Sequence, residues 1–145
     1  MIKFWRTTDK YGCFSNFSAH SIEANGKTYP SSEHFYQAHK ATSEEDHELI
    51  RRAKGCKACK NLAHEIEMRP DWEGLKFSIM LAALRLKVQQ YEFIREKLLE
   101  TGDQEIIEDS PYDEVWGSGR NGQGMNLLGK AWMQVREELR SDERR

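Results

Sequence analysis

The long tract between Trp72 and Gly102 constrains the fold of this 145-residue chain more than any other segment. Its apolar side chains recur about every 3.6 positions, which places them on one face of an α-helix. They are Leu75, Ile79, Ala82, Ala83, Leu86, Ile94 and Leu98. The pair Gln89 and Gln90 marks a point where the tract can break. A helical stripe of this length needs other elements to cover it, so the sequence predicts a mostly helical domain.

Shorter helices are predicted on both sides of the long tract. One begins at Ser31 or Ser32, either of which can cap a helix N-terminus, and reaches about residue 41. The next, over residues 43–54, has acidic residues in its first turn and basic residues in its last, an order that complements the helix dipole. A short helix over residues 57–66 and a last helix from Asn126 complete the set.

Strands are predicted mainly in the first thirty residues. Residues 2–5 form a short strand, and residues 22–24 and 27–29 flank Asn25-Gly26, a dipeptide that accepts positive φ at both positions of a hairpin turn. Residues 105–108 are a further short strand. No repeat or linker divides the chain. We therefore expect one compact α+β domain over residues 1–145, mostly α, with a small antiparallel β element at the N-terminus.

Charge and hydropathy limit the function classes. The chain has 22 Lys and Arg against 24 Asp and Glu, a balance that argues against binding to duplex nucleic acid by phosphate neutralisation. The longest uncharged apolar run, residues 78–84, is far shorter than the roughly 18 residues of a membrane span. The first residues carry no apolar signal core, and three cysteines suit reduced thiols. We expect a cytoplasmic protein without membrane contact.

Glu33, Gln37 and Lys40 have the spacing i, i+4, i+7 and therefore share one helix face. On a cleft wall this face offers a general acid or base, a hydrogen-bonding amide and an anion-binding amine. The alternative is a solvent-exposed face on which the glutamate favours the helix dipole. His34 and His39 lack the i, i+4 spacing of zinc ligands on a helix, so no metal site is predicted there.

The pair Cys56 and Cys59 has a Cys-x-x-Cys spacing, with His64 nearby. Structural zinc requires four ligands and only three candidates gather here, so we interpret the cysteines as ordinary helical thiols. Trp72 stands at a predicted helix start, where it can be a core residue or a platform on which a flat ring stacks.

The segment before the last helix is rich in glycine, with Gly117, Gly119, Gly122 and Gly124 in eight residues. The spacing matches Gly-x-Gly-x-x-Gly, but the βαβ unit that this fingerprint needs is missing. A glycine loop that enters a helix at Asn126 offers unpaired backbone N–H groups, and Arg120 adds a guanidinium. Together these groups can bind an anion such as phosphate. The alternative is a flexible surface loop.

Several of these segments together resemble the YbiA-like family of the NADAR superfamily. The resemblance is carried in order by residues 14–17, 30–40, 71–73, 98–102, 113–119 and 124–129, which are distributed over nearly the whole chain. It implies a mostly α-helical fold with a small β element and an N-glycosidase activity. The family's best-known members hydrolyse ribosylaminopyrimidine phosphates, early intermediates of riboflavin biosynthesis, and others are associated with ADP-ribose, including its removal from guanine.

The resemblance also assigns roles to residues. Glu33 and Asp113 correspond to the family's carboxylates and are the catalytic candidates, and Trp72 corresponds to a ligand-stacking residue. Cleavage of a C1'–N bond needs a proton for the leaving nitrogen and a base for water, roles that two carboxyl groups can divide. The remaining candidates for contacts with a small ribosyl phosphate are Asn16, Phe17, Gln37, Lys40, Trp116, Gly117, Gly119, Arg120 and Asn126.

This interpretation requires no metal and no cofactor. Two other functions stay open at this point. One is an ADP-ribosyl glycohydrolase acting on ADP-ribosylated guanine or nucleic acid with the same carboxylates. The other is a module that binds NAD or ADP-ribose without turnover.

Overall fold

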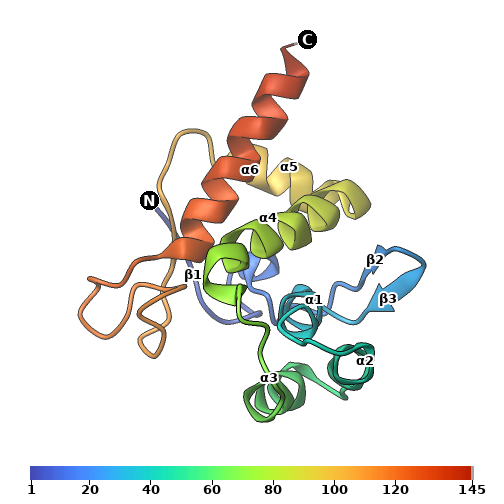
Figure 1. Cartoon of the computed structure of the whole chain (residues 1–145). Helices are drawn as coiled ribbons and strands as arrows, with labels where there is room; N and C mark the ends of the chain where they lie inside the picture. The colour runs from blue at the N-terminus through green and yellow to red at the C-terminus, as the bar shows by residue number, and fades with distance from the viewer. Residues whose placement is uncertain (145) are drawn as a thin grey trace. The chain divides into compact units, whose positions relative to one another are not determined.

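The computed structural model describes residues 1–144, which form two compact units (Figure 1). One unit consists of residues 16–90, and the other combines residues 1–15 with residues 91–145. Helices predominate over short strands, which confirms the mostly helical α+β class. Within residues 1–144 no helix is both long and apolar enough to cross a bilayer. A single domain over the whole chain stays a prediction.

The unit of residues 16–90 begins with the predicted hairpin. Ile22 pairs with Tyr29, and Asn25 and Gly26 have φ values of 54° and 78°, as the turn requires. The elements of this unit are β2 (Ile22–Ala24), β3 (Lys27–Tyr29), α1 (Ser32–Ala38), α2 (Glu44–Arg51), α3 (Cys56–Glu65) and α4 (Trp72–Gln90). Helix α4 ends where the break near Gln89 was predicted.

Helix α1 is the central element of this unit. It packs against α2, α3 and α4, and Figure 1 shows it next to α2 and α3. The apolar core around it consists of Ile22, Tyr29, Phe35, Ala38, Ile50, Cys59, Ala63 and Ala83. All seven residues of α1 are buried, so the solvent-exposed face that the spacing alone allowed for Glu33 and Gln37 is wrong. Neighbouring helices enclose the polar side chains of α1 along with the apolar ones.

The second unit contains a parallel pair of strands. Strand β1 (Ile2–Phe4) lies beside β4 (Ile106–Glu108), with Ile2 opposite Ile106. The prediction of antiparallel pairing is thus confirmed for the hairpin but does not extend to β1. Parallel strands need a long connection rather than a tight turn, and about a hundred residues separate these two. The other elements of this unit are η1 (Gly12–Phe14), α5 (Glu92–Glu100) and α6 (Leu127–Glu143).

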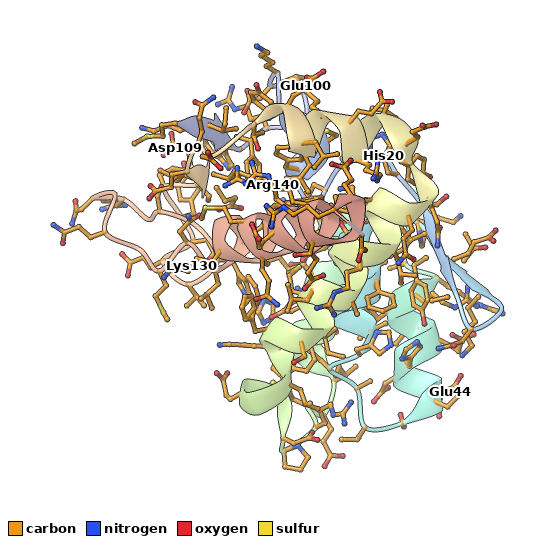
Figure 2. All side chains as sticks on the ribbon, turned by 90° about the horizontal axis from the view of Figure 1, so that it is seen from above. His20, Glu44, Glu100, Asp109, Lys130 and Arg140 are labelled. Carbon is orange, nitrogen blue, oxygen red and sulfur yellow. The ribbon has the colours of Figure 1, made fainter. Side chains whose placement is uncertain are left out.

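Aromatic rings form the core of this second unit. Phe14 packs against Phe4, Tyr11 and Trp132, with ring centroids 5.8, 5.6 and 4.8 Å apart. The indole N–H of Trp132 also donates to the backbone oxygen of Phe14 at 3.0 Å. Between Asp109 at the end of β4 and Lys130 in the first turns of α6, Figure 2 shows a loop that extends away from the helix. This loop contains the glycine-rich segment.

Candidate active site

The first group of candidate residues lies on helix α1. Ser31 caps the helix, and its hydroxyl accepts a hydrogen bond from the backbone N–H of His34 at 3.2 Å. Glu33 follows in the first turn, and its side chain is enclosed, with 7% of the residue exposed. Burial of a carboxylate is costly unless neighbouring groups stabilise it. The Glu33 carboxyl therefore needs polar neighbours.

Gln37 lies one turn after Glu33 and contacts it directly. Its Nε2 donates a hydrogen bond to Oε1 of Glu33 at 3.1 Å, which confirms that the two side chains share a helix face. Gln37 is 4% exposed. Within residues 1–144 its other amide atom, Oε1, is buried and accepts no hydrogen bond. Only the Nε2 end of the Gln37 amide thus contacts the Glu33 carboxyl group.

Lys40 places a positive charge near the same carboxylate. The predicted helix extended to about residue 41, but α1 ends at Ala38, so Lys40 lies in the turn that follows. Its Nζ lies 5.6 Å from the centroid of the Tyr36 ring. Burial lowers the pKa of Lys40, while attraction to Glu33 counteracts this effect. Lys60 and Lys76 lower the pKa of Lys40 further by repulsion.

Trp72, at the start of α4, packs against Tyr36. The two ring centroids are 5.1 Å apart with an interplanar angle of 60°. Only 2% of Trp72 is exposed, which agrees with the interpretation of this residue as part of the core. A stacking role would require its ring to become accessible when a ligand binds, and it stays a prediction.

Asn16 and Phe17 occupy different environments. Asn16 is buried, and its Oδ1 accepts a hydrogen bond from the Ser32 hydroxyl at 2.8 Å. Its Nδ2 approaches the Met80 sulfur at 3.4 Å. Asn16 therefore ties the N-terminus of α1 to α4. Phe17 is 43% exposed and can still offer a ring face to a ligand.

The two cysteines of α3 contact the first turn of α1, a relationship that sequence analysis missed. The thiol of Cys59 approaches the backbone oxygen of Glu33 at 3.7 Å, and that of Cys56 approaches the Ser31 hydroxyl at 3.3 Å. Burial raises the pKa of both thiols, which suits neutral packing groups. The Cys-x-x-Cys spacing was the available signal, since it places both thiols on one side of α3.

The second group of candidates belongs to the other unit, around Asp113. Its Oδ1 accepts hydrogen bonds from the backbone N–H groups of Val115 and Trp116 at 3.0 and 2.8 Å. Asp113 thereby fixes the turn that presents Trp116, and both residues are half-buried. A catalytic role of Asp113 stays a prediction. Arg120 is exposed further along the same loop.

The glycine-rich loop does not offer a row of unpaired amides, so that prediction is wrong for much of the segment. The loop closes on itself because its N–H groups donate to backbone oxygens, as those of Gly119, Gly124 and Asn126 do to Ser110, Ser118 and Gly117. The glycines instead allow neighbouring backbone and side-chain atoms to lie closer than a Cβ atom would permit. A Cβ on Gly117 would lie 2.0 Å from a carboxylate oxygen of Glu108, and one on Gly124 would lie 2.4 Å from the Gly117 oxygen.

Asn126 uses its side chain to support the backbone of β4. Its Oδ1 accepts from the N–H of Glu108, and its Nδ2 donates to the oxygen of Ile106, both at 2.9 Å. The residue stands before α6 with a positive φ of 51°, a conformation that asparagine tolerates. Both ends of the amide are committed, so Asn126 acts as a structural anchor between β4 and α6.

The structure thus brings Glu33, Gln37 and Lys40 together in one unit and gathers Asp113, Trp116 and the glycines in the other. Pairing of Glu33 with Asp113 across the two units stays a prediction.

Known proteins with the same pattern identify the family. Residues 3–140 match the NADAR domain. The chain is 40% identical over 141 residues to "N-glycosidase YbiA" of Shigella boydii, covering 96% of this chain and 88% of that protein. It is 37% identical to "Riboflavin biosynthesis protein VVA0006" of Vibrio vulnificus, covering 95% of this chain and 38% of the longer relative.

A solved structure agrees with these sequence matches. The NMR structure of the Escherichia coli protein YbiA superposes with a TM-score of 0.91 at 38% identity, covering 98% of this chain and 86% of the other. An agreement of sequence and fold over this length confirms the family that the sequence motifs indicated: this chain belongs to the NADAR domain family, among proteins named as N-glycosidases.

Proposed function

We propose that this NADAR-family N-glycosidase hydrolyses the C1'–N bond of a ribosylaminopyrimidine 5'-phosphate, an intermediate of riboflavin biosynthesis. The products are the free pyrimidine and ribose 5-phosphate. The observation that carries the proposal is the buried Glu33 carboxylate, held by Gln37 at 3.1 Å with Lys40 nearby. A relative named for riboflavin biosynthesis, 37% identical over 140 residues, supports the choice of substrate class.

The reaction needs two proton transfers. As the C1'–N bond breaks through an oxocarbenium-like state, an acid protonates the leaving nitrogen and a base accepts a proton from the attacking water. Glu33 provides one of these groups and Asp113 the other. Because Oδ1 of Asp113 already accepts two backbone hydrogen bonds, the proton transfer at this residue takes place at Oδ2.

The remaining candidates bind the two ends of the substrate. The loop amides of Gly119 and Gly124 are committed to backbone oxygens, so the side chains of Lys40 and Arg120 are the better candidates for phosphate contacts. Phe17 and Trp116 are accessible aromatic rings on which the flat pyrimidine can stack. The ring of Trp72 is buried against Tyr36. Gly117 and Gly119 shape the loop beside Trp116.

The decisive experiment offers the purified protein a panel of substrates and detects each released base by mass spectrometry. The panel contains ribosylaminopyrimidine phosphates, NAD, ADP-ribose and ADP-ribosylated DNA. We expect cleavage of the first class, with and without a chelator. Cleavage of ADP-ribosylated DNA alone, or activity that a chelator abolishes and zinc restores, would contradict the proposal.

A further inference from the structure

The amide oxygen of Gln37 is unusual among the polar groups of α1. It is buried and accepts no hydrogen bond within residues 1–144. A buried acceptor without a partner costs about 1–3 kcal/mol, and such groups are rare in native structures. Its retention beside a candidate catalytic carboxylate therefore calls for a functional explanation.

Three donors of α1, α3 and the turn after α1 are committed to other acceptors. The hydroxyl of Ser32 donates to Asn16, and the thiol of Cys59 points to the backbone oxygen of Glu33. The backbone N–H of Lys40 donates to the backbone oxygen of Gln37, not to its side chain. A partner for Oε1 must therefore come from outside this set.

The hydrogen bond between Gln37 and Glu33 fixes the orientation of the Gln37 amide. Nε2 is the donor of the amide, so it faces the carboxyl oxygen of Glu33 and Oε1 points away. Reversal of the amide would place its oxygen against the carboxyl oxygen. The unpartnered oxygen is thus a consequence of the contact that positions Glu33.

We propose that Gln37 is a specificity-determining residue of the reaction: Nε2 positions Glu33, and Oε1 accepts a hydrogen bond from an N–H or O–H donor of the ribosylaminopyrimidine substrate. This inference rests on the proposed function and adds a substrate contact to it. Because Oε1 is enclosed, the donor reaches it only after a local side-chain movement on binding. The donor is either an amino group of the pyrimidine or the 2'-hydroxyl of the ribose.

Substrate analogues that lack one donor test the contact. The value of kcat/KM is measured for the substrate, its 2'-deoxyribosyl analogue and an analogue without the amino group next to the glycosidic nitrogen. We expect the wild type to discriminate against one analogue by about tenfold or more, and Gln37→Met to lose this discrimination. Differences in intrinsic reactivity between the compounds cancel when the kcat/KM ratios of the wild type and the variant are compared, because both proteins are assayed with the same compounds.

A matched control exists on α6, where Gln134 donates to Glu138 across one turn at 3.3 Å on the exposed surface. Gln134→Met removes a similar amide from a similar local pair and should leave the discrimination unchanged. Equal discrimination in wild type and Gln37→Met would overturn the inference, since it would mean that only water meets Oε1.

The positioning half of the inference has a readout independent of turnover. The pKa of the Glu33 carboxyl, followed by its side-chain carbon resonance in NMR, should rise in Gln37→Met because a donor to the ionised form is lost. Lys40, Cys56 and Cys59, which interact electrostatically with Glu33, are unchanged in this variant. An unchanged pKa would overturn this half. A wild type inactive on every substrate would instead contradict the proposed function.

Discussion

Both oxygens of Asn16 accept hydrogen bonds from the start of helix α1: its Oδ1 from the hydroxyl of Ser32 at 2.8 Å, and its backbone oxygen from the N–H of Glu33 at 3.2 Å. The candidate catalytic carboxylate therefore depends on a residue seventeen positions earlier in the chain. The four N–H groups of a helix's first turn need partners outside the helix, and Asn16 supplies one of them.

Asn16→Leu should lower the free energy of unfolding by about 1–3 kcal/mol, because the buried Ser32 hydroxyl loses its acceptor at 2.8 Å and keeps only the Asn16 backbone oxygen at 3.5 Å. Urea denaturation measures this loss. Asn16→Asp keeps an acceptor for Ser32 and serves as the comparison. If Asn16→Leu were as stable as the wild type, the side-chain contact would have no role in holding α1.

Glu33→Gln should lower kcat by about 10²–10⁴-fold, because the variant keeps the shape of the side chain but cannot exchange a proton. Substrate affinity should change little. Stability should hold or rise, since the substitution removes a buried charge. Turnover and urea denaturation are compared with Glu45→Gln, which alters an exposed glutamate in the first turn of α2. Near wild-type turnover in Glu33→Gln would leave Asp113 as the principal acid or base.

Local features of the fold could be predicted from the sequence because neighbouring residues determine them. The hairpin turn at Asn25-Gly26 follows from φ preferences. Ser43, the first residue of the predicted helix over residues 43–54, caps α2, since its hydroxyl accepts a hydrogen bond from the N–H of Asp46 at 3.1 Å. The contact between Glu33 and Gln37 is another case, since residues four apart on a helix lie side by side.

Features that depend on distant segments could not be predicted. The sequence left the solvent exposure of α1 open because α2, α3 and α4, which enclose it, lie elsewhere in the chain. Asn126 was interpreted as a ligand contact, but its amide bonds to residues of β4 eighteen and twenty positions earlier. The glycine loop was predicted to bind an anion through unpaired N–H groups. Its internal backbone hydrogen bonds cannot be recognised from amino-acid composition.

Trp72→Ala should lower the free energy of unfolding by about 3–5 kcal/mol, because truncation of a buried tryptophan leaves a cavity beside Tyr36. Trp72→Phe should retain part of that stability. Urea denaturation and ligand affinity are measured together on both variants. Weaker ligand binding with an unchanged free energy of unfolding would assign the ring to ligand stacking instead of the core.

We expect the protein to lose stability in mild acid, because three of its histidines are buried or half-buried. Burial lowers the pKa of His34, of which 1% is exposed, and also the pKa values of His39 and His47. The His39 and His47 ring centroids are 4.9 Å apart, and Nε2 of His47 lies 2.8 Å from the Tyr29 hydroxyl. These rings are therefore held in the neutral form in the folded state.

The sign of the effect follows from proton counting. Above about pH 6.5, the ordinary pKa of histidine, both the folded and the unfolded chain keep these rings neutral, and the full stability is present. As the pH falls below this value the unfolded chain binds protons first, so the free energy of unfolding declines by up to about 1.4 kcal/mol per pH unit for each ring, until the folded-state pKa is passed. Urea denaturation between pH 8 and pH 5 measures this slope.

The slope of unfolding free energy against pH should be shallower in His47→Gln, which removes one titrating ring, than in His64→Gln, which alters an exposed histidine of α3. Identical slopes in the two variants would show that protonation of His47 is not coupled to unfolding.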